Sequence, residues 1–162
     1  MILHPIPPVF DTHSRVLILG SFPSVKSREE GFFYGHRKNR FWPLIAALTG
    51  EATPKTVEAK RTLLLRHGIA LWDVLAACDI TGSADSTIKN ATPNDLAPIL
   101  TAAPIELVIT NGRTAHAHYV KHTYPITRRE AVCLPSTSPA NAACSLPTLI
   151  DAWGTVLCPF LS

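Results

Sequence analysis

The sequence predicts an α/β protein: a three-layer α/β/α sandwich with a central four-stranded parallel sheet, in a single domain over residues 1–162. Four short apolar runs are typical of buried strands, and segments with apolar residues at helical spacing separate them. Strands that alternate with helices are joined by right-handed crossovers, which produce a parallel sheet covered on both faces. The length of 162 residues suits one hydrophobic core.

A strand, a loop and a helix are predicted before Gly50. Residues 15–20 read Arg-Val-Leu-Ile-Leu-Gly, an apolar run of the kind that is buried on both faces of a sheet. Residues 21–27 are predicted as a loop. Apolar residues then recur at helical spacing from Phe41 to Leu48, and Gly50 is a natural helix stop.

A second helix and a second strand are predicted next. Thr53 and Pro54 are expected to open the helix as N-cap and first helical residue, and Gly68 to end it. Residues 69–74, Ile-Ala-Leu-Trp-Asp-Val, form the second apolar run. A long polar loop is predicted from there to Asn90.

The last third of the chain is predicted to hold two strands and three helices. Residues 92–95, Thr-Pro-Asn-Asp, resemble a capping box and predict a helix start. Residues 106–111 and 131–134 are predicted strands, with a helix over 113–124 between them. Ser145 is predicted to cap the final helix, whose apolar residues recur at helical spacing: Leu146, Leu149, Ile150, Trp153 and Leu157.

Chemically active residues follow the predicted strands at their carboxyl ends. These are residues 21–23 (Ser-Phe-Pro), Asp73, Asn111 and residues 135–137 (Pro-Ser-Thr). In sheets of this class, ligands bind at the carboxyl ends of the strands. The sequence therefore predicts one functional site at this edge of the sheet.

Composition alone excludes some functions and leaves others open. Hydrophobic residues make up 46% and charged residues 17%, and the net charge of +3 is too small to indicate nucleic-acid binding. Five bases nevertheless fall in one window, offset by two acids: Lys26, Arg28, Arg37, Lys38 and Arg40. A solvated loop and a phosphate-binding segment are both consistent with this window.

Several classes of site and location are not expected. No apolar run reaches the length of a membrane helix, and the first residues lack the regions of a signal peptide. The four cysteines form no C-x-x-C, and no histidine pair stands at metal-binding spacing on a convincing helix, so no metal and no cofactor are expected. We expect a monomer with reduced thiols in the cytoplasm, with access to the nucleoid.

Residues 31–42 combine aromatic, basic and amide side chains: Gly-Phe-Phe-Tyr-Gly-His-Arg-Lys-Asn-Arg-Phe-Trp. Aromatic faces stack on nucleobases, and guanidinium and ammonium groups bind phosphates. An amide at the start of a helix can position a water molecule or a base edge. The segment predicts a protein that binds a nucleic acid and acts on one base. Core packing of the aromatic rings and helix capping by Asn39 are the simpler alternatives.

Four motifs follow one another along the chain: Gly-Ser-Phe-Pro-Ser after the first strand, Tyr-Gly-His-Arg-Lys-Asn-Arg-Phe-Trp-Pro, Thr-Asn-Gly, and Leu-Pro-Ser-Thr-Ser-Pro-Ala-Asn. In this order they resemble the uracil-DNA glycosylase superfamily, and most closely its hypoxanthine (deoxyinosine) DNA glycosylase branch. The mismatch-specific uracil/thymine glycosylases share the Asn-Arg-Phe-Trp element. The resemblance covers most of the chain and implies a four-stranded parallel sheet between helices.

The resemblance implies an enzyme of base excision repair that acts on damaged DNA. It would flip out a deaminated base, hypoxanthine first and uracil or a related base second, and hydrolyse its N-glycosidic bond. Asn39 would be the catalytic amide. Tyr34 and Phe22 would hold the face of the flipped base, and Asn111 would bind its edge. Asp73 is also expected to contact the base. Two alternatives are that burial keeps its carboxyl group protonated, or that it braces the loop without touching the base.

Phosphate contacts are expected from hydroxyl and basic side chains in three segments: Ser24, Ser27, Arg37, Lys38, Arg40, Ser136, Thr137 and Ser138. The chain also departs from the family pattern. Ser24 and Arg37 replace a usual Gly and Pro, Leu134 replaces a histidine of the main uracil branch, and Phe22 stands where other branches have an acid or amide that activates water. The last two departures shift the catalytic role to Asn39.

Two further functions remain open from the sequence. A binding module for damaged DNA without catalysis would fit the missing water activator. A small doubly wound nucleotide-binding or hydrolase domain would fit the fold class. The chain has no G-x-G-x-x-G, no G-x-x-x-x-G-K-[ST] and no G-x-S-x-G, which disfavours the second.

Overall fold

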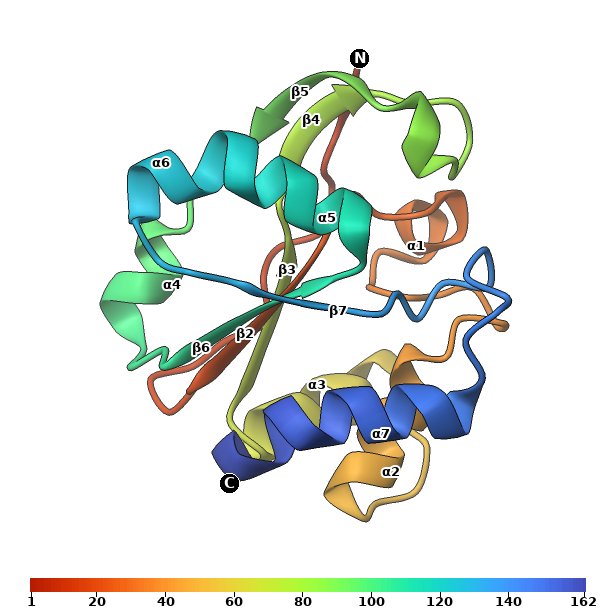
Figure 1. Cartoon of the computed structure of the whole chain (residues 1–162), viewed down its shortest axis with the longest axis vertical. Coiled ribbons are helices and arrows are strands. Elements are labelled where there is room, and N and C mark those ends of the chain that lie inside the picture. The colour runs from red at the N-terminus through yellow and green to blue at the C-terminus, as the bar shows by residue number, and fades with distance from the viewer.

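The larger of two sheets forms the centre of the molecule (Figure 1). The computed structural model describes residues 1–162. Four parallel strands lie in the order β3-β2-β6-β7: β2 Val16–Gly20, β3 Ile69–Asp73, β6 Leu107–Asn111 and β7 Val132–Leu134. The predicted parallel four-stranded sheet is thus confirmed, with each strand within a residue of its predicted start and end.

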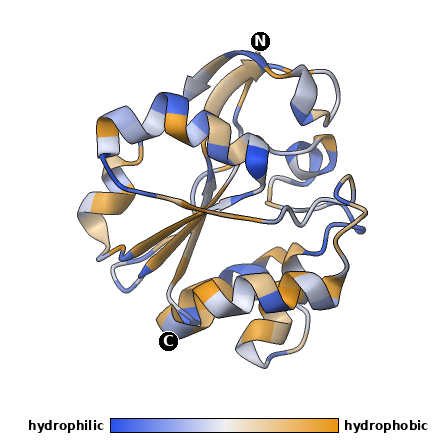
Figure 2. Cartoon of the chain, in the orientation of Figure 1, coloured by the Kyte–Doolittle hydropathy of each residue, from blue (hydrophilic) through white to orange (hydrophobic).

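Both faces of the three strands β2, β3 and β6 are largely buried, which explains why these strands are mostly apolar. Val16 and Ile18 of β2 pack in one cluster of buried side chains, and Leu17 and Leu19 pack in another. Successive residues of a strand point to opposite faces, so one run supplies both clusters. In Figure 2 the central strands are coloured hydrophobic over most of their length.

Seven α-helices surround the sheet: α1 Val25–Glu30, α2 Phe41–Thr49, α3 Val57–Arg66, α4 Ala97–Ala102, α5 Arg113–His118, α6 Tyr124–Thr127 and α7 Leu146–Leu157. Figure 1 shows α2, α3 and α7 on one face and α4, α5 and α6 on the other. A π-helical stretch, Tyr119–Thr123, joins α5 to α6, and 3-10 turns occupy Asp85–Thr87 and Cys158–Phe160. None of the helices combines the length and apolar character needed to span a bilayer.

The predicted caps are partly right. Ser145 caps α7 by accepting a hydrogen bond from the Thr148 amide, and Gly50 ends α2 in the left-handed conformation, with φ of 71°. The start of α3 was placed too early, because Thr56 rather than Thr53 is its N-cap. The start of α4 was also placed too early, because Thr92 pairs with Ala77 in a strand.

The predicted polar loop before Asn90 is wrong. It contains β4 Leu75–Asp79, and β5 Lys89–Pro93 follows; with β1 Ile2–Leu3 they form an antiparallel sheet in the order β1-β4-β5. Most side chains of β5 are exposed, so this strand has polar residues and no apolar signal. The sequence also did not predict helix α1, which begins inside the predicted loop at residues 21–27 and continues beyond it.

Candidate active site

The ends of the central strands meet the 31–42 segment at one edge of the sheet. A Cβ atom on Gly20 would stand 2.4 Å from Asp73 Oδ1 and 3.0 Å from the hydroxyl oxygen of Tyr34. Asn111, at the end of β6, donates from Nδ2 to the same hydroxyl at 3.1 Å. Gly20 lets these groups approach because it has no side chain. The predicted convergence at the carboxyl ends of the strands is therefore present in the structure.

Thr137 connects two asparagines in a directed chain of hydrogen bonds. Asn111 Nδ2 donates to Thr137 Oγ1 at 3.0 Å, and Thr137 Oγ1 donates to Asn39 Oδ1 at 2.9 Å. The backbone amide of Thr137 donates to Asn111 Oδ1 at 3.0 Å. Thr137 is fully buried, so the predicted contact of its hydroxyl with a phosphate is corrected: the hydroxyl is used inside the protein.

These bonds fix the orientation of the Asn39 amide. The backbone N–H of Phe41 can only donate, and it lies 2.9 Å from Asn39 Oδ1, so the oxygen must face inward. With Thr137 as the second donor, both lone pairs of Oδ1 are used. Asn39 Nδ2 bonds to no protein group. Thr123 Oγ1 is the one unpaired polar side-chain atom that is fully buried, so Nδ2 keeps contact with solvent.

Tyr34 is held in a conformation that few residues adopt. Its φ of 52° lies in the left-handed region, which is unfavourable for an aromatic residue and common at functional sites. Its ring stacks on Phe41 with centroids 4.3 Å apart and an angle of 23°. Burial and, secondarily, the Asp73 carboxylate raise the pKa of Tyr34 far above its usual range, so the hydroxyl stays protonated.

The predicted pair of aromatic faces around a base is not what the structure offers. Phe41 covers one face of Tyr34, and Phe22 is only 7% exposed. The His4 ring lies edge-on to Phe22 at 5.8 Å, and the Arg28 guanidinium lies 5.8 Å from the centroid of Phe22. Phe22 therefore packs into the core beside the site, and Tyr34, which is partly buried, stacks on Phe41.

Asp73 is paired with a residue that the sequence did not indicate. His4 Nε2 lies 2.8 Å from Asp73 Oδ2, and the two side chains are 3% and 4% exposed. The Ile6 amide donates to His4 Nδ1 at 3.2 Å, which leaves Nε2 as the protonated nitrogen. His4 thus donates to the Asp73 carboxyl group and holds it in place. A lone histidine before Pro5 carries no sequence signal for this contact.

The guanidinium of Arg40 is tied to the loop after β7. Its Nε donates to the carbonyl of Thr137, Nη1 to that of Cys144, and Nη2 to those of Ser138 and Asn141. Four of its five N–H groups are therefore used. This corrects the predicted phosphate contact of Arg40, which instead holds the loop that carries Thr137.

Removal of the Arg40 charge tests this correction. Arg40→Gln should lower the free energy of unfolding by about 2 kcal/mol, because part-buried carbonyls lose a charged donor. The salt dependence of DNA binding should not change. Urea unfolding and a salt titration measure the two effects. In Arg40→Lys, which keeps the charge but not the fork of donors, stability should also fall; wild-type stability in this variant would instead support a phosphate contact.

Several predicted phosphate ligands also have partners within the protein. Ser24 is the N-cap of α1, and its hydroxyl bonds both the amide and the hydroxyl of Ser27. Ser27 is buried and accepts from the Gly35 amide at 2.9 Å, so its predicted phosphate contact is corrected too. Ser136 and Ser138 are partly exposed, and each accepts one amide within its own loop.

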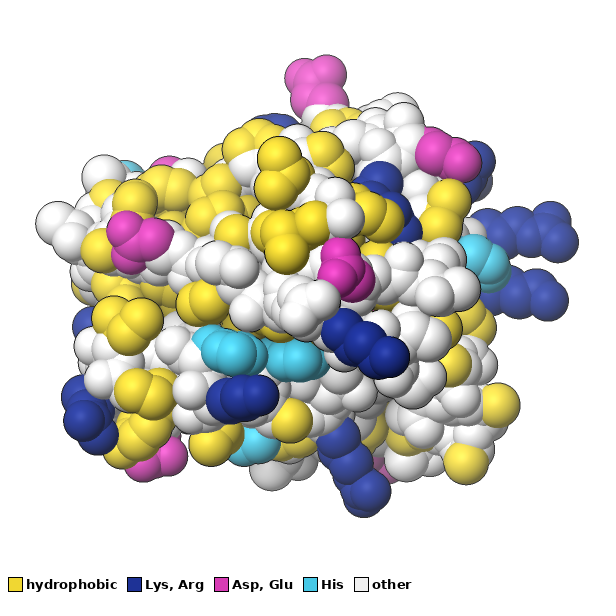
Figure 3. All heavy atoms as spheres, turned by 90° about the horizontal axis from the view of Figure 1, so that it is seen from above, with side chains coloured by type: hydrophobic (Ala, Val, Ile, Leu, Met, Phe, Trp, Pro, Cys, Tyr) yellow, Lys and Arg dark blue, Asp and Glu magenta, His cyan; other side chains and the backbone are white.

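Two bases keep the properties expected of phosphate ligands. Arg37 and Lys38 are exposed, and neither forms an ion pair within the chain. Lys26 by contrast pairs with Glu30 at 3.3 Å, and Arg28 donates to backbone carbonyls. Figure 3 shows Lys and Arg side chains that project into solvent at one end of the molecule.

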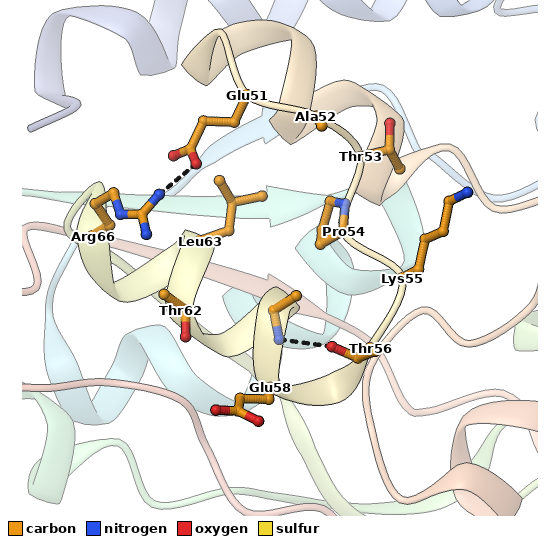
Figure 4. Close-up of a pocket in the computed structure, with 11 residues that line it drawn as sticks. Glu51, Ala52, Thr53, Pro54, Lys55, Thr56, Glu58, Thr62, Leu63 and Arg66 are labelled. Atoms are coloured by element: carbon orange, nitrogen blue, oxygen red, sulfur yellow. Dashed lines mark hydrogen bonds and ion pairs between the residues drawn. The ribbon is translucent and has the colours of Figure 1, made fainter.

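Two surface hollows lie away from this site. One of about 610 Å³ is lined by the loop of residues 51–56 and by α3, where the Arg66–Glu51 pair and the Thr56 cap face it (Figure 4). A second of about 310 Å³ is lined by residues 93–97, 100, 123, 126 and 127. Neither is lined by a predicted site residue. The functional groups are gathered at the sheet edge instead.

The expectation that no histidine pair stands at helical i, i+4 spacing is wrong for one pair. His118 and His122 lie one helical turn apart, and their rings stack with centroids 5.9 Å apart. No cluster of three or more His, Cys, Asp or Glu side chains could hold a metal ion. The continuous helix from α5 through α6 explains the pair, because the π-helical stretch keeps the turn unbroken.

Comparisons with known proteins converge on one family. The model of the Uracil DNA glycosylase superfamily matches residues 7–153. A hypoxanthine DNA glycosylase of Methanosarcina acetivorans is 36% identical, over 87% of this chain and 89% of its own length. A second hypoxanthine DNA glycosylase, from Methanosarcina barkeri, is 34% identical over 91% of this chain and 92% of its own length. The solution NMR structure of a candidate uracil DNA glycosylase from Methanosarcina acetivorans has a TM-score of 0.83 at 33% identity and covers 99% of both chains.

Proposed function

The chain belongs to the uracil DNA glycosylase superfamily and is a DNA glycosylase, and from this premise we propose that it excises hypoxanthine from DNA. The two relatives named hypoxanthine DNA glycosylase support this base over uracil. Leu134 and Phe22 also stand where a uracil enzyme would have its histidine and its acid. That the enzyme works as a monomer in the cytoplasm stays a prediction.

The reaction requires that the damaged nucleotide leave the helix. A base inside a duplex hides its glycosidic bond, and flipping costs a few kcal/mol, with the least cost at a mispaired base. Hypoxanthine opposite thymine is such a base. The sheet edge with Tyr34 and Asn111 would receive the flipped nucleotide, and no cofactor is needed for hydrolysis.

The orientation of Asn39 is the observation that carries the proposal. Its Nδ2 faces solvent while Phe41 and Thr137 hold its oxygen. As the N-glycosidic bond breaks, the electron pair leaves with the base, and water adds to C1′ of the sugar. A fixed N–H donor stabilises negative charge that develops on the departing base or orients the incoming water. Because both lone pairs of Oδ1 are used, Asn39 acts as a donor and does not take the proton of the water.

The absence of an acid in the first loop is compatible with this chemistry. Glycosidic hydrolysis proceeds through a transition state with positive charge on the sugar, which a weakly activated water can attack. Catalysis then depends on stabilising the leaving base rather than on a strong general base. Asn111 contributes indirectly, since both of its amide hydrogens bond Tyr34 and Thr137.

Phosphate binding is proposed for the exposed bases before α2. Each ionic phosphate contact changes the slope of log K against log salt by about 0.9. The double variant Arg37→Ala/Lys38→Ala should therefore bind DNA with a slope weaker by about 1.8. Fluorescence anisotropy at several salt concentrations measures this slope. Lys55→Ala, at an exposed base lining the hollow of Figure 4, is the control and should leave it unchanged.

A panel of labelled duplexes tests the proposal. Each carries one hypoxanthine, uracil, xanthine or normal base, and alkali converts abasic sites into strand breaks. We expect cleavage first at hypoxanthine. Binding without cleavage would support the non-catalytic DNA-binding alternative, and neither binding nor cleavage would support the nucleotide-binding alternative.

A further inference from the structure

The proposed reaction leaves one proton without an acceptor. Water that adds to C1′ of the sugar loses a proton as the N-glycosidic bond breaks. Asn39 does not take this proton, because both lone pairs of its Oδ1 are used. The first loop has Phe22 where other branches have an acid or amide. A carboxylate within hydrogen-bond reach of the water is a usual acceptor, and here it must come from another segment.

A carboxylate reaches the first loop from the connection between β4 and β5. Asp85 is the first residue of the 3-10 turn, and its Oδ2 accepts a hydrogen bond from Ser21 Oγ at 2.9 Å. Ser21 directly follows Gly20, and the hydroxyl oxygen of Tyr34 lies 3.0 Å from the position that a Cβ on Gly20 would occupy. Asp85 therefore lies next to the sheet edge at which the other functional groups meet.

The connection that carries Asp85 is fixed against α1. The Val25 amide donates to Ser83 Oγ at 2.9 Å, and Arg28 Nη2 donates to the carbonyl of Gly82 at 2.7 Å. Figure 1 shows this connection beside α1. Because these bonds hold the turn, the carboxyl group of Asp85 keeps one place relative to the first loop.

The Asp85 carboxyl group has the properties of a proton acceptor. Ser21 uses its Oδ2, but Oδ1 bonds to no protein group and is not among the fully buried unpaired atoms, so it keeps contact with solvent. Partial loss of hydration raises the pKa of Asp85, the Ser21 hydrogen bond lowers it, and the nearby Asp73 raises it, so that the pKa is raised overall. A raised pKa makes a carboxylate a stronger base, which favours proton transfer from water.

Titratable and charged groups from four segments lie near Asp85: Asp73 of β3, Tyr34 before α2, Cys78 of β4 and Arg28 of α1. Burial and, to a smaller extent, nearby carboxylates raise the pKa of Tyr34 and of Cys78. Both groups therefore keep their protons at neutral pH and do not compete for the proton of water. Asp73 is only 3% exposed, whereas Asp85 keeps exposed surface through which water can enter.

We propose that Asp85 accepts the proton of the attacking water, with Ser21 as the residue that positions its carboxyl group. This inference rests on the proposed function. As the bond between the water oxygen and C1′ forms, an O–H bond of the water breaks and its proton moves to Asp85 Oδ1. The electron pair of the N-glycosidic bond leaves with the base, whose negative charge the Asn39 N–H stabilises. Asp85 later passes the proton to solvent and is again a carboxylate.

Asp85→Asn tests the proton transfer with little change in shape. The amide keeps an oxygen for the Ser21 hydroxyl but cannot take a proton from water. We expect the single-turnover rate of hypoxanthine release at neutral pH to fall about 10²-fold, with DNA affinity unchanged. Asp79→Asn, at the end of β4, is the matched control and should keep the wild-type rate.

The pH profile separates proton transfer from a structural role. The wild-type rate should fall as the pH decreases, because a protonated Asp85 accepts no further proton, and this acid limb should be absent in Asp85→Asn. Ser21→Ala removes the hydrogen bond that lowers the pKa of Asp85, so the acid limb of this variant should lie at higher pH. Single-turnover rates at saturating enzyme, measured over a range of pH, report this limb without a contribution from binding.

Two results would overturn the inference. One is a wild-type rate in Asp85→Asn, and the other is a slower variant that keeps the acid limb of the wild type, because its defect would be structural. In both cases, release of hypoxanthine by the wild type leaves the proposed function intact, whereas a wild type that releases no base contradicts the function itself. If Asp85→Asn does not fold, Ser21→Ala decides: a limb at higher pH supports the inference, and an unchanged limb overturns it.

Discussion

Replacing Asn39 by alanine is expected to lower the rate of hypoxanthine release by about 10²- to 10³-fold, the effect of losing one donor aimed at developing charge. DNA binding should persist, since Arg37 and Lys38 are untouched. The free energy of unfolding should fall by about 1 kcal/mol, because the Phe41 amide loses its partner at the start of α2. Single-turnover assays and urea unfolding measure the two effects.

Asn39→Asp separates the donor from its structural role. The carboxylate keeps an oxygen for the Phe41 amide and for Thr137, so stability should stay closer to that of the wild type. The carboxylate has no N–H donor, so activity should be lost as it is in the Asn39→Ala variant. Wild-type activity in the alanine variant would remove Asn39 from the reaction. Activity in the aspartate variant alone would indicate an acceptor and would contradict the donor role.

Thr137→Val is expected to give the second large effect. Valine keeps the shape of threonine but breaks the chain from Asn111 to Asn39, so the Asn39 amide loses one of the two bonds that orient it. We expect kcat to fall by about 10²-fold, the cost of a small misplacement of a catalytic group. The unfolding free energy should fall by about 1–3 kcal/mol, since a buried amide loses its acceptor.

Thr137→Ser is the matched control because it restores the hydroxyl. It should recover most of the kcat that valine loses, and KM should change little in both variants. If the hydroxyl instead bound a DNA phosphate, the valine variant would raise KM and leave kcat near that of the wild type. Steady-state kinetics at two salt concentrations distinguish these outcomes.

The sequence predicted those parts of the fold that depend on one continuous segment. The strands β2, β3 and β6 are mostly apolar because both of their faces are buried, and this pattern is visible without knowledge of the neighbouring strands. Strand β5 could not be predicted in this way. Its side chains are mostly exposed, and it forms only by pairing with β4. Neither of these two segments has a sequence pattern that predicts a strand by itself.

The site was predictable as a location but less so as a set of roles. Its residues directly follow the strands, and the carboxyl ends of parallel strands lie at the same edge of the sheet whatever conformation the loops adopt. The partners of Arg40 lie 97 to 104 residues away, so its bonds to carbonyls of the loop could not be read from the basic window. His4 and Asp73 are 69 residues apart, and no local pattern joins them. The burial of Thr137 follows from the path of that loop, so the sequence alone does not distinguish it from a surface hydroxyl.

Detection of the free base is the most direct measurement of the central claim. A duplex with one hypoxanthine opposite thymine is incubated with excess protein, and the small molecules are separated by chromatography. The account predicts one equivalent of free hypoxanthine together with an abasic strand, and little of either with Asn39→Ala. A strand that keeps its hypoxanthine, or equal release by the wild type and the Asn39 variant, would contradict it.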